Sequence, residues 1–584
     1  MTRLWNAPAD FADEMIEGFV AANARYVRRV PGGVVRATPA PEGRVAVVVG
    51  GGSGHYPAFG GLVGAGLADG AAMGNLFASP SAQQIHAVAR AAHAGGGVLF
   101  SYGNYAGDVL NFDAAQERLR GEGIACETVA VTDDIASASA DEQHRRRGIA
   151  GDLTVFRSAA GAASAGYDLA GVARVARLAN DRTRSFGVAF SGCTLPGAPE
   201  PLFSVPDGRM AIGLGIHGEP GIDESDVPTA DGLAELLVTT LLAERPDGAD
   251  ARVVPILNGL GSLKYEEMFV VYRRIAQLLA DAGLEVIDPH VGEYCTSFDM
   301  AGTSLTLFWL DDELAELWET PVDAPAYRRG AVAPEASARS GESGATADAA
   351  DADADTAATI VPGDTDSRSV ARVVVEVVDA VARTVDTHVD ELGRMDAIAG
   401  DGDHGIGMQR GSHAARTAAH EAEAAGAGAS TTLARAADAW SDRAGGTSGA
   451  LWGVILTSVA SALGDAGRPD AAGVAAGVAA ATRGVMSYGK AELGDKTMVD
   501  ALVPFSAELS TAVGTGASLA EAWRTAASVA TSAAAATAAL LPRMGRARTH
   551  GQHSVGTPDP GAHSLALIAT AIGDVLTHHE RTPS

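Results

Sequence analysis

The distribution of apolar and polar residues divides the chain into two regions of different character. Before residue 331, short runs of β-branched residues alternate with alanine-rich helical stretches. The runs that predict strands are residues 44–50, 97–101, 124–131, 186–190 and 252–257. Continuous apolar strands of this kind are covered by helices on both faces in α/β proteins. Residues 1–330 are therefore expected to form an α/β domain, itself of two lobes.

After residue 368 the pattern changes, and no stretch reads convincingly as a strand. Alanine-rich segments separated by Gly and Asp turns predict helices at residues 369–392, 431–444, 449–463, 470–485 and 519–541. Apolar residues recur in these segments at helical spacing, and the intervening Gly and Asp residues are typical helix boundaries. Residues 369–584 are therefore expected to form an all-α domain.

The segment between these regions, residues 331–368, has a composition of its own. Residues 331–366 are rich in Ala, Asp, Gly, Ser and Thr, and carry eight acidic residues and one basic residue, a local charge of −7. Such a segment buries too little apolar area to offset its chain entropy. It predicts a flexible, self-repelling linker, with a long helical surface loop as the alternative.

Composition narrows the choice of partners and compartment. The 584 residues include 43 Lys and Arg against 72 Asp and Glu, a formal charge of −29, which disfavours nucleic acid and anionic membranes as partners. Three cysteines without CxxC spacing fit a reducing compartment. Residues 525–542 are the best candidate for a membrane span, but they are too weakly apolar and instead predict a buried small-residue helix. With no signal-peptide core near Met1, a cytoplasmic protein is expected.

Three glycine-containing loops in the first region carry candidate chemistry. The sequence GGGSGHYP at residues 50–57 directly follows a predicted strand, GNYAGD at residues 103–108 follows another, and residues 213–221 place His217 among glycines. Successive glycines let the backbone approach a ligand and direct N–H groups at its oxygen atoms. The first of these loops has neither Walker nor GxGxxG spacing. On local evidence alone, His55 is as readily a turn residue, and His217 a structural or surface histidine.

Together these loops resemble the substrate domain of the dihydroxyacetone kinase family. GGGSGH, NYxGDxLNF, SxCTxPG, GIHGEPG and LNGLG occur in the family's order within residues 1–330. The resemblance implies that His217 forms a covalent hemiaminal with the ketone carbon, that His55 hydrogen-bonds the substrate and assists the addition, and that Asp108 accepts the proton of the attacking hydroxyl. Addition to a carbonyl but not to an alcohol would exclude glycerol. The substrate-binding residues implied are Gly52, Ser53, Gly54, His55, Gly103 and Asp108.

Two positions depart from the family pattern. Gly103 stands where the family usually has Lys, and Tyr56 stands where it usually has Glu. Loss of the lysine side chain leads to the hypothesis of a pocket enlarged for a longer ketose, erythrulose, with the D form favoured. The GHYP and GNYAGD motifs resemble the erythrulose-kinase branch of the family. The alternative is neutral drift, with water in the gap and dihydroxyacetone as substrate.

A second constellation follows the linker. Asp396, Asp401 and Asp403 fall within eight positions of a glycine-rich segment, with Asp396 expected near a helix end and the other two in a turn. Hard cations such as Mg²⁺ prefer oxygen ligands, and nucleotide phosphates complete their coordination. An EF-hand is excluded because the third ligand and closing Glu are missing at the required spacing. An acidic turn that only caps helices is the other interpretation.

Further loops in this region are similar to the nucleotide domain of the same family. GDGDxG, GGxSGxLxG, GDKTMxD and DPGA occur within residues 369–580. The resemblance implies a barrel of eight antiparallel helices, with Asp396, Asp401 and Asp403 holding two Mg²⁺ ions that bridge the ATP phosphates. The nucleotide-binding residues it implies are His404, Gly405, Ile406, Gly407, Thr447, Ser448, Gly489, Met498, Arg546, Asp559, Pro560 and Gly561.

The two constellations together predict an ATP-dependent ketose kinase with both half-sites on one chain. Its expected partners are a small ketose, ATP and a second copy of the chain in a homodimer. The sequence leaves open whether the phosphoryl group passes within a chain or across a dimer. Three other functions stay open: a dihydroxyacetone kinase, an enzyme that also cyclises FAD with release of AMP, and a non-catalytic ketose sensor.

Overall fold

The computed structural model describes residues 4–219, 221–330, 360–400, 402–544 and 553–581. The chain forms two compact units, Met1–Gly344 and Ala345–Ser584. Most of the predicted linker, residues 331–359, lies outside the described residues. Its last residues already belong to helix α9 (Thr365–Ala399), which Asp364 caps by accepting a hydrogen bond from the Ser367 N–H. The helix therefore begins before the boundary at residue 368, because an Asp three residues before a backbone donor is an effective N-cap.

The first sheet of the α/β unit has six strands in the order β1-β2-β4-β3-β5-β6. Strands β4, β3, β5 and β6 run parallel, while β1 and β2 form an antiparallel edge. Their bounds are β1 Val27–Val30, β2 Gly33–Arg36, β3 Ala46–Gly52, β4 Gly70–Gly74, β5 Val98–Gly103 and β6 Cys126–Val131. The strands predicted at residues 44–50, 97–101 and 124–131 are thus confirmed, each within a few residues of its ends.

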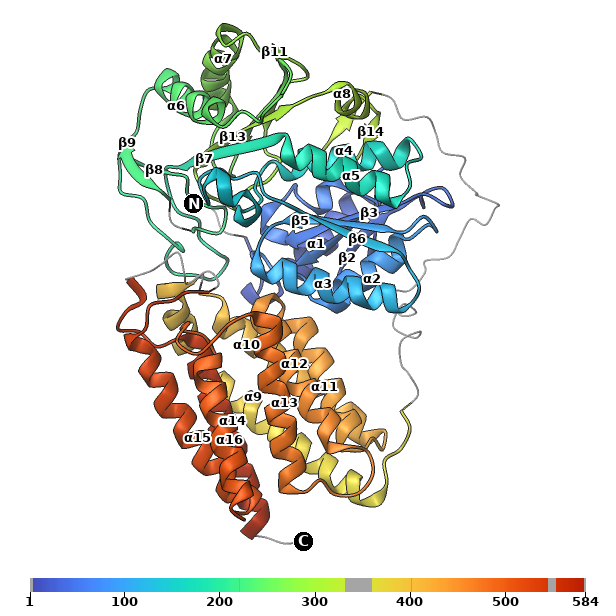
Figure 1. Cartoon of the computed structure of the whole chain (residues 1–584), viewed down its shortest axis with the longest axis vertical. Helices are drawn as coiled ribbons and strands as arrows, with labels where there is room; N and C mark the ends of the chain where they lie inside the picture. The colour runs from blue at the N-terminus through green and yellow to red at the C-terminus, as the bar shows by residue number, and fades with distance from the viewer. Residues whose placement is uncertain (1–3, 220, 331–359, 401, 545–552, 582–584) are drawn as a thin grey trace. The chain divides into compact units, whose positions relative to one another are not determined.

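Strand β3 shows why these runs are continuously apolar. Its alternate residues Val47 and Val49 pack toward one layer of helices, and Ala46 and Val48 pack toward the other. Figure 1 shows the two layers on opposite faces of the sheet. One layer holds α4 (Asp152–Ser164) and α5 (Leu169–Asp181), and the other holds α2 (Ala82–Ala92) and α3 (Ala106–Gly121).

The second sheet of this unit has seven strands, mostly antiparallel, in the order β11-β10-β13-β7-β8-β9, with β12 also paired to β10. At its centre Leu305 lies opposite Leu257 on one side and Phe186 on the other. Helices α6 (Ala230–Ala243) and α7 (Tyr265–Asp281) pack on one face of the sheet. The strands are β7 Thr183–Ala189, β8 Arg209–Ile212, β9 Asp223–Asp226, β10 Arg252–Gly259, β11 Glu285–Val286, β12 His290–Gly292 and β13 Gly302–Trp309. The expected two-lobed α/β architecture is confirmed.

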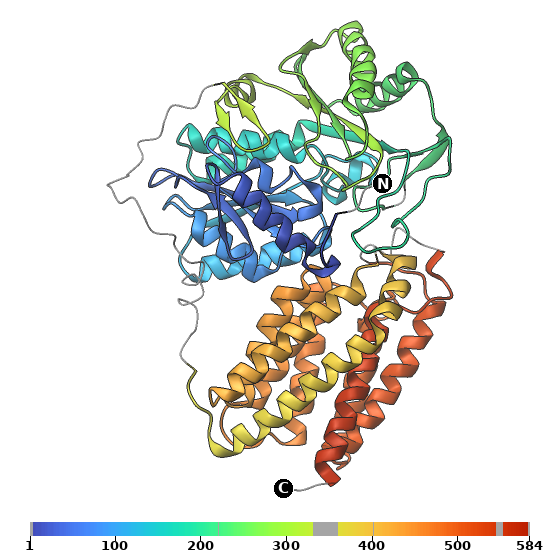
Figure 2. The same ribbon diagram turned by 180° about the vertical axis from the view of Figure 1, so that it is seen from behind.

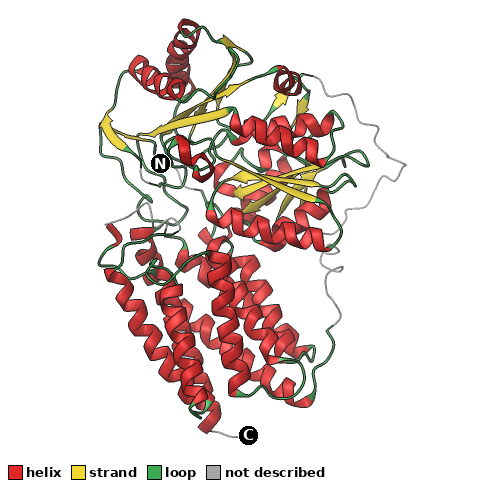
Figure 3. Ribbon diagram, in the orientation of Figure 1, coloured by secondary structure: helices red, strands yellow, loops and turns green. Residues whose placement is uncertain are grey.

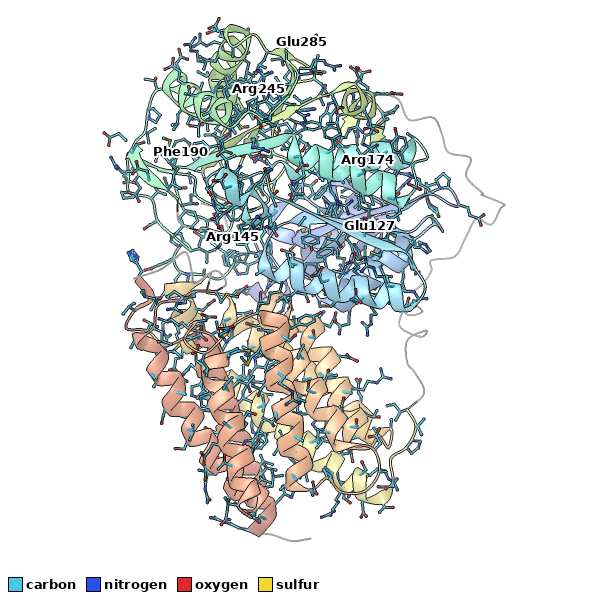
Figure 4. All side chains as sticks on the ribbon, viewed as in Figure 1. Glu127, Arg145, Arg174, Phe190, Arg245 and Glu285 are labelled. Carbon is cyan, nitrogen blue, oxygen red and sulfur yellow. The ribbon has the colours of Figure 1, made fainter. Side chains whose placement is uncertain are left out.

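Shorter elements complete the unit. Helix α1 (Phe11–Ala22) precedes the first sheet, and α8 (Asp312–Trp318) precedes a two-stranded ribbon of β14 (Val322–Asp323) and β15 (Arg328–Arg329). Arg174 and Glu127, both labelled in Figure 4, are charged side chains that are partly exposed. Arg174 pairs with Glu313 at 2.9 Å, an exposed contact that adds little to stability.

The second unit is helical throughout its described residues (Figure 3). Consecutive helices pack against each other, and α16 packs against both α15 and α9, so the eight helices close into a ring (Figure 2). This confirms the eight-helix architecture that the family resemblance implied. The remaining bounds are α10 His404–Ala424, α11 Ala429–Ala444, α12 Gly446–Leu463, α13 Ala471–Gly489, α14 Val499–Gly514, α15 Leu519–Ala536 and α16 Pro560–Arg581.

An apolar cavity of about 210 Å³ lies inside the ring of helices. Its lining consists of aliphatic and aromatic side chains, among them Val374, Trp440, Trp452 and Ile455. In the described part of the chain, α12 is the one helix long and apolar enough to span a membrane by length and composition, with a mean hydropathy of 1.3. The apolar residues of α12 line this cavity, which accounts for its composition. The segment at 525–542, expected to be the best candidate for a span, does not meet the same criterion.

Candidate active site

His55 lies at the end of a short 3₁₀ turn, Ser53–His55, that directly follows strand β3. The turn is fixed to the neighbouring loop because the Gly54 N–H donates to the Leu76 carbonyl at 2.7 Å. The His55 side chain is buried, and its ring stacks on Phe77 with centroids 4.9 Å apart. The glycine-rich sequence after β3 therefore turns the chain sharply and places an imidazole under an aromatic ring.

The structure brings His217 directly to His55. Their Nε2 atoms are 2.9 Å apart, and the rings meet edge to face. Phe77 and Tyr105 both present their rings edge-on to His217, at centroid distances of 5.5 and 4.5 Å. Two histidines from loops 162 residues apart in sequence are thus enclosed by aromatic side chains.

Glu219 holds His217 from the side away from His55. One carboxylate oxygen lies 3.1 Å from His217 Nδ1, and the other accepts the His217 backbone N–H at 3.1 Å. Behind it, Arg147 lies 3.7 Å from Glu219 and 2.8 Å from Asp134. Burial opposes ionisation of Glu219, but the charges of His217 and Arg147 outweigh it, so the pKa of Glu219 lies well below its ordinary range.

Sequence reasoning missed four neighbours of the histidine pair: Phe77, Tyr105, Arg147 and Glu219. Glu219 and Tyr105 stand inside the GIHGEPG and GNYAGD motifs, so their positions beside His217 and Asp108 were an available signal. Phe77 and Arg147 have no comparable local signal, because only the tertiary fold brings them to the histidines.

Gly103 ends strand β5, and Asp108 lies in the first turn of α3, three residues beyond Tyr105. The Asp108 side chain is almost fully buried. A Cβ added at Gly103 would lie 3.1 Å from Tyr105 Cε2 and 3.2 Å from the Gly148 carbonyl oxygen. The Tyr105 ring therefore lies against Gly103, and the enlarged pocket for a longer ketose stays a prediction. Tyr56, the other departure, is half-exposed and meets Phe19 edge-on.

A second set of predicted residues meets at one end of the helical unit. Asp396 lies in the last turn of α9, and Asp403 directly precedes α10. The His404 N–H donates to Asp396 Oδ2 at 3.2 Å, which ties the two helix ends together. Gly405 packs so closely on α9 that an added Cβ would lie 2.1 Å from the Val389 carbonyl oxygen. Burial, reinforced by Asp396, raises the pKa of Asp403 above its ordinary range.

The starts of three other helices join this set. His404 Nε2 is 3.0 Å from Ser564 Oγ of α16 and its Nδ1 is 3.4 Å from Ser448 Oγ in the first turn of α12. Met498, which precedes α14, lies beside Gly561 of α16. Burial, reinforced by Asp396 and Asp500, raises the pKa of Asp559 to about 7.

The remaining predicted residues are less clearly part of this set. Thr447 and Ile406 lie in the first turns of α12 and α10 and are exposed, and Gly407 follows Ile406. Gly489 ends α13 beside Leu451. Pro560 begins α16. Asp401 and Arg546 lie outside the described residues.

The carboxylates at this end suit a hard cation. No three His, Cys, Asp or Glu side chains of the described residues are grouped as a preformed metal site. However, Asp403 and Asp559 are partly buried and share the neighbour Asp396, so each carboxylate resists ionisation. A divalent cation would offset this repulsion, and oxygen ligands are those that Mg²⁺ prefers. The donor set therefore fits magnesium.

Comparison with known proteins assigns a family to both units. Residues 17–326 match the model of the Dak1 domain, and residues 398–574 match that of the DAK2 domain. The chain is 59% identical to an L-erythrulose kinase of Pectobacterium atrosepticum, covering 99% of this chain and 97% of the relative. It is 54% identical to a D-erythrulose kinase of Mycolicibacterium smegmatis, covering 99% of each.

Solved structures agree with these relatives. A crystal structure of the dihydroxyacetone kinase from C. freundii in complex with AMP-PNP and Mg²⁺ is 28% identical, with a TM-score of 0.52. The similarity covers 98% of this chain and 99% of that one. With both domain models matched in order and relatives similar along their whole length, this chain belongs to the dihydroxyacetone kinase family.

Proposed function

We propose that this chain is an ATP-dependent kinase whose substrate is erythrulose, with residues 1–330 as the ketose domain and residues 369–584 as the nucleotide domain. The observation that carries the proposal is identity of 52–59% along the whole chain with three relatives named erythrulose kinases. Two of these are named for the L form and one for the D form, so identity favours L-erythrulose, whereas the D form was expected from the sequence.

In the ketose domain, His217 Nε2 adds to the ketone carbon and His55 hydrogen-bonds the carbonyl oxygen. The contact of 2.9 Å between the two Nε2 atoms supports these roles, because one carbonyl group can then face both nitrogens. Asp108 accepts the proton of the hydroxyl that attacks phosphorus. The carbonyl requirement excludes polyols such as glycerol.

In the nucleotide domain, Asp396, Asp401 and Asp403 would hold two Mg²⁺ ions, and the first turns of α10, α12 and α16 would surround the ATP phosphates. Helix N-termini favour anions because their backbone N–H groups are free to donate. Bound magnesium supplies neutralisation of the phosphate charge.

We also propose a cytoplasmic homodimer that binds neither nucleic acid nor membrane. The three cysteines are free and buried, which is in keeping with a reducing compartment. Helix α7 exposes three apolar residues, Tyr265, Phe269 and Val270, an arrangement that suits a second copy of the chain. Sedimentation of the full chain tests the dimer, and a monomer at micromolar concentration would refute it.

A coupled assay of ADP release over dihydroxyacetone, D-erythrulose and L-erythrulose tests the substrate. An erythrulose enantiomer should show the highest kcat/KM, and the proposal fails if dihydroxyacetone does. His217→Ala should abolish ketose capture, whereas Asp401→Ala should retain capture and lose phosphoryl transfer. Intact ketose affinity and turnover in the His217→Ala protein would refute the covalent role.

A second candidate activity is cyclisation of a flavin nucleotide. It is favoured by 32% identity, over 98% of this chain, to the human protein named triokinase/FMN cyclase. Release of AMP from FAD in the presence of Mn²⁺ would demonstrate it, and absence of AMP under conditions that support ketose phosphorylation would exclude it.

A further inference from the structure

The hydrogen bonds around the two histidines determine where their ring protons lie. His55 Nδ1 is 2.8 Å from the Thr296 carbonyl oxygen. A carbonyl oxygen can only accept, so Nδ1 of His55 carries a proton. On the other ring, His217 Nδ1 faces Glu219 Oε1 at 3.1 Å, and both side chains are 6% exposed. The ionised carboxylate also only accepts, so Nδ1 of His217 carries a proton as well.

The remaining contact, between the two Nε2 atoms, then needs a third proton. With both Nδ1 atoms protonated, neutral rings would point two Nε2 lone pairs at each other across 2.9 Å. A proton between them turns this repulsion into a hydrogen bond. Two imidazoles that hold three ring protons carry one positive charge, and Glu219 supplies the balancing negative charge next to His217.

We propose that Glu219 is a positioning residue for ketose capture, holding His217 by Nδ1 and retaining one extra proton in the His55–His217 pair for delivery to the ketone oxygen. The inference rests on the proposed capture of the ketose by His217. In the capture step, the Nε2 lone pair of His217 forms the bond to the ketone carbon, and the carbon–oxygen π pair takes the proton from His55 Nε2. The product is a hemiaminal hydroxyl, a neutral His55 and an alkylated His217 ring that bears the positive charge.

The step therefore moves one positive charge from the ring of His55 to the ring of His217, which contacts Glu219. The carboxylate is closer to the charge after addition than before it, so Glu219 stabilises the adduct more than the free enzyme. Arg147 fixes the other side of the carboxylate and is itself paired with Asp134. This second ion pair prevents the carboxylate from turning away from His217.

The other titratable groups around the pair leave this charge balance intact. Tyr105, edge-on to His217, is partly buried and Cys295 beyond it is buried. Desolvation raises both pKa values well above their ordinary range, so both groups stay neutral. The pKa of Arg147 is raised because Asp134 and Glu219 together outweigh its burial, so it stays cationic. The other acidic groups nearby are Asp134 and Asp108. Asp134 forms an ion pair with Arg147, and Asp108 lies in the first turn of α3, three residues beyond Tyr105.

The test is the Glu219→Gln variant of the full chain, which retains shape and removes the charge. Binding of [2-¹³C]erythrulose, both enantiomers, is measured without ATP by the shift of the labelled carbon from ketone to hemiaminal. We expect roughly 10- to 100-fold weaker capture in the variant, the range of a charge-assisted hydrogen bond. As the pH rises, the variant should lose capture at a lower pH than the wild type does, because the extra proton leaves its histidine pair more easily.

The matched control is Glu224→Gln, on the exposed strand β9 of the same unit, which should leave affinity and pH profile unchanged. Wild-type affinity and an unshifted pH profile in Glu219→Gln would overturn the inference while leaving the kinase activity in place. No hemiaminal signal in the wild type would instead refute the covalent capture itself. If Glu219→Gln does not fold, ¹⁵N-histidine spectra of the wild type decide: a protonated His217 Nδ1 supports the inference, and an unprotonated one refutes it.

Discussion

Replacing Asp559 by Asn should stabilise the helical unit, and increasingly so as the pH rises. Asp559 is partly buried, and its pKa is raised from 3.8 to about 7 because desolvation and the nearby charges of Asp396 and Asp500 penalise the carboxylate. Between pH 4 and 7 the unfolded chain has released this proton while the folded chain still holds it. Stability therefore falls with rising pH through this window and changes no further above pH 7.

The size of the effect follows from the pKa difference. At ~1.4 kcal/mol per unit, ionised Asp559 costs about 2 kcal/mol at pH 5 and about 4 kcal/mol at pH 8. The Asn variant avoids this cost, and its amide oxygen can still accept the Ala562 N–H that Asp559 caps at 2.7 Å. The negative charge of Asp559 partly offsets the positive charge of Lys496. In the Asn variant, the Lys496 ammonium still donates a hydrogen bond to the Ser554 carbonyl.

Scanning calorimetry of the full chain without nucleotide provides the assay, with the helical unit identified as the transition that Mg²⁺ shifts. At pH 8, Asp559→Asn should raise this transition by roughly 10 °C, and by about half as much at pH 5. Asp438→Asn, a change of the same type at an exposed position of α11, serves as control. Equal melting of wild type and Asp559→Asn at pH 8, or a gain that does not grow between pH 5 and pH 8, would refute the reasoning.

Three further outcomes are expected. Gly103→Ala should push the Tyr105 ring off His217 by a few tenths of an ångström, lowering kcat/KM for erythrulose about tenfold in the ADP-release assay with ATP affinity unchanged. Phe77→Leu should remove the ring stacked on His55 and lower kcat/KM roughly two- to tenfold, measured the same way. Arg157→Met should lower the urea stability of the α/β unit by ~3 kcal/mol, because its buried guanidinium donates to Trp318 and Thr320. Unchanged kcat/KM in Gly103→Ala or Phe77→Leu, or unchanged urea stability in Arg157→Met, would contradict the role inferred for the contact that the variant changes.

The strands of the α/β unit were predictable because burial on both faces leaves a simple signature. Residues 46–49 of β3 are apolar without interruption, as two helical layers require. Helices α10, α14 and α16 were not recognised from the residue pattern. The buried side of α10 consists largely of Gly, Ala and Ser, such as Gly411, Ser412 and Ala415, so it shows no apolar periodicity.

The candidate site was predictable to the extent that its residues stand in motifs. His55 and His217 were chosen from separate loops, and the structure places them in contact. Arg147 and Phe77 could not be found this way, since their relation to the histidines depends on how β6 and β4 are ordered in the first sheet. Gly103 shows a different limit, because the sequence does not reveal that the Tyr105 ring lies against this glycine.

The apolar cavity within the ring of helices has a mechanical consequence. The cavity is not sealed from solvent, but its walls are almost wholly aliphatic and aromatic and offer water few hydrogen-bond partners. Part of this space therefore stays empty in the folded unit and is filled by water once the helices separate. Unfolding of this unit is therefore accompanied by a decrease in volume, and hydrostatic pressure favours the state of smaller volume. Compression thus acts against the domain that holds the carboxylates of the proposed nucleotide site, and provides a means of loosening it without heat, acid or denaturant.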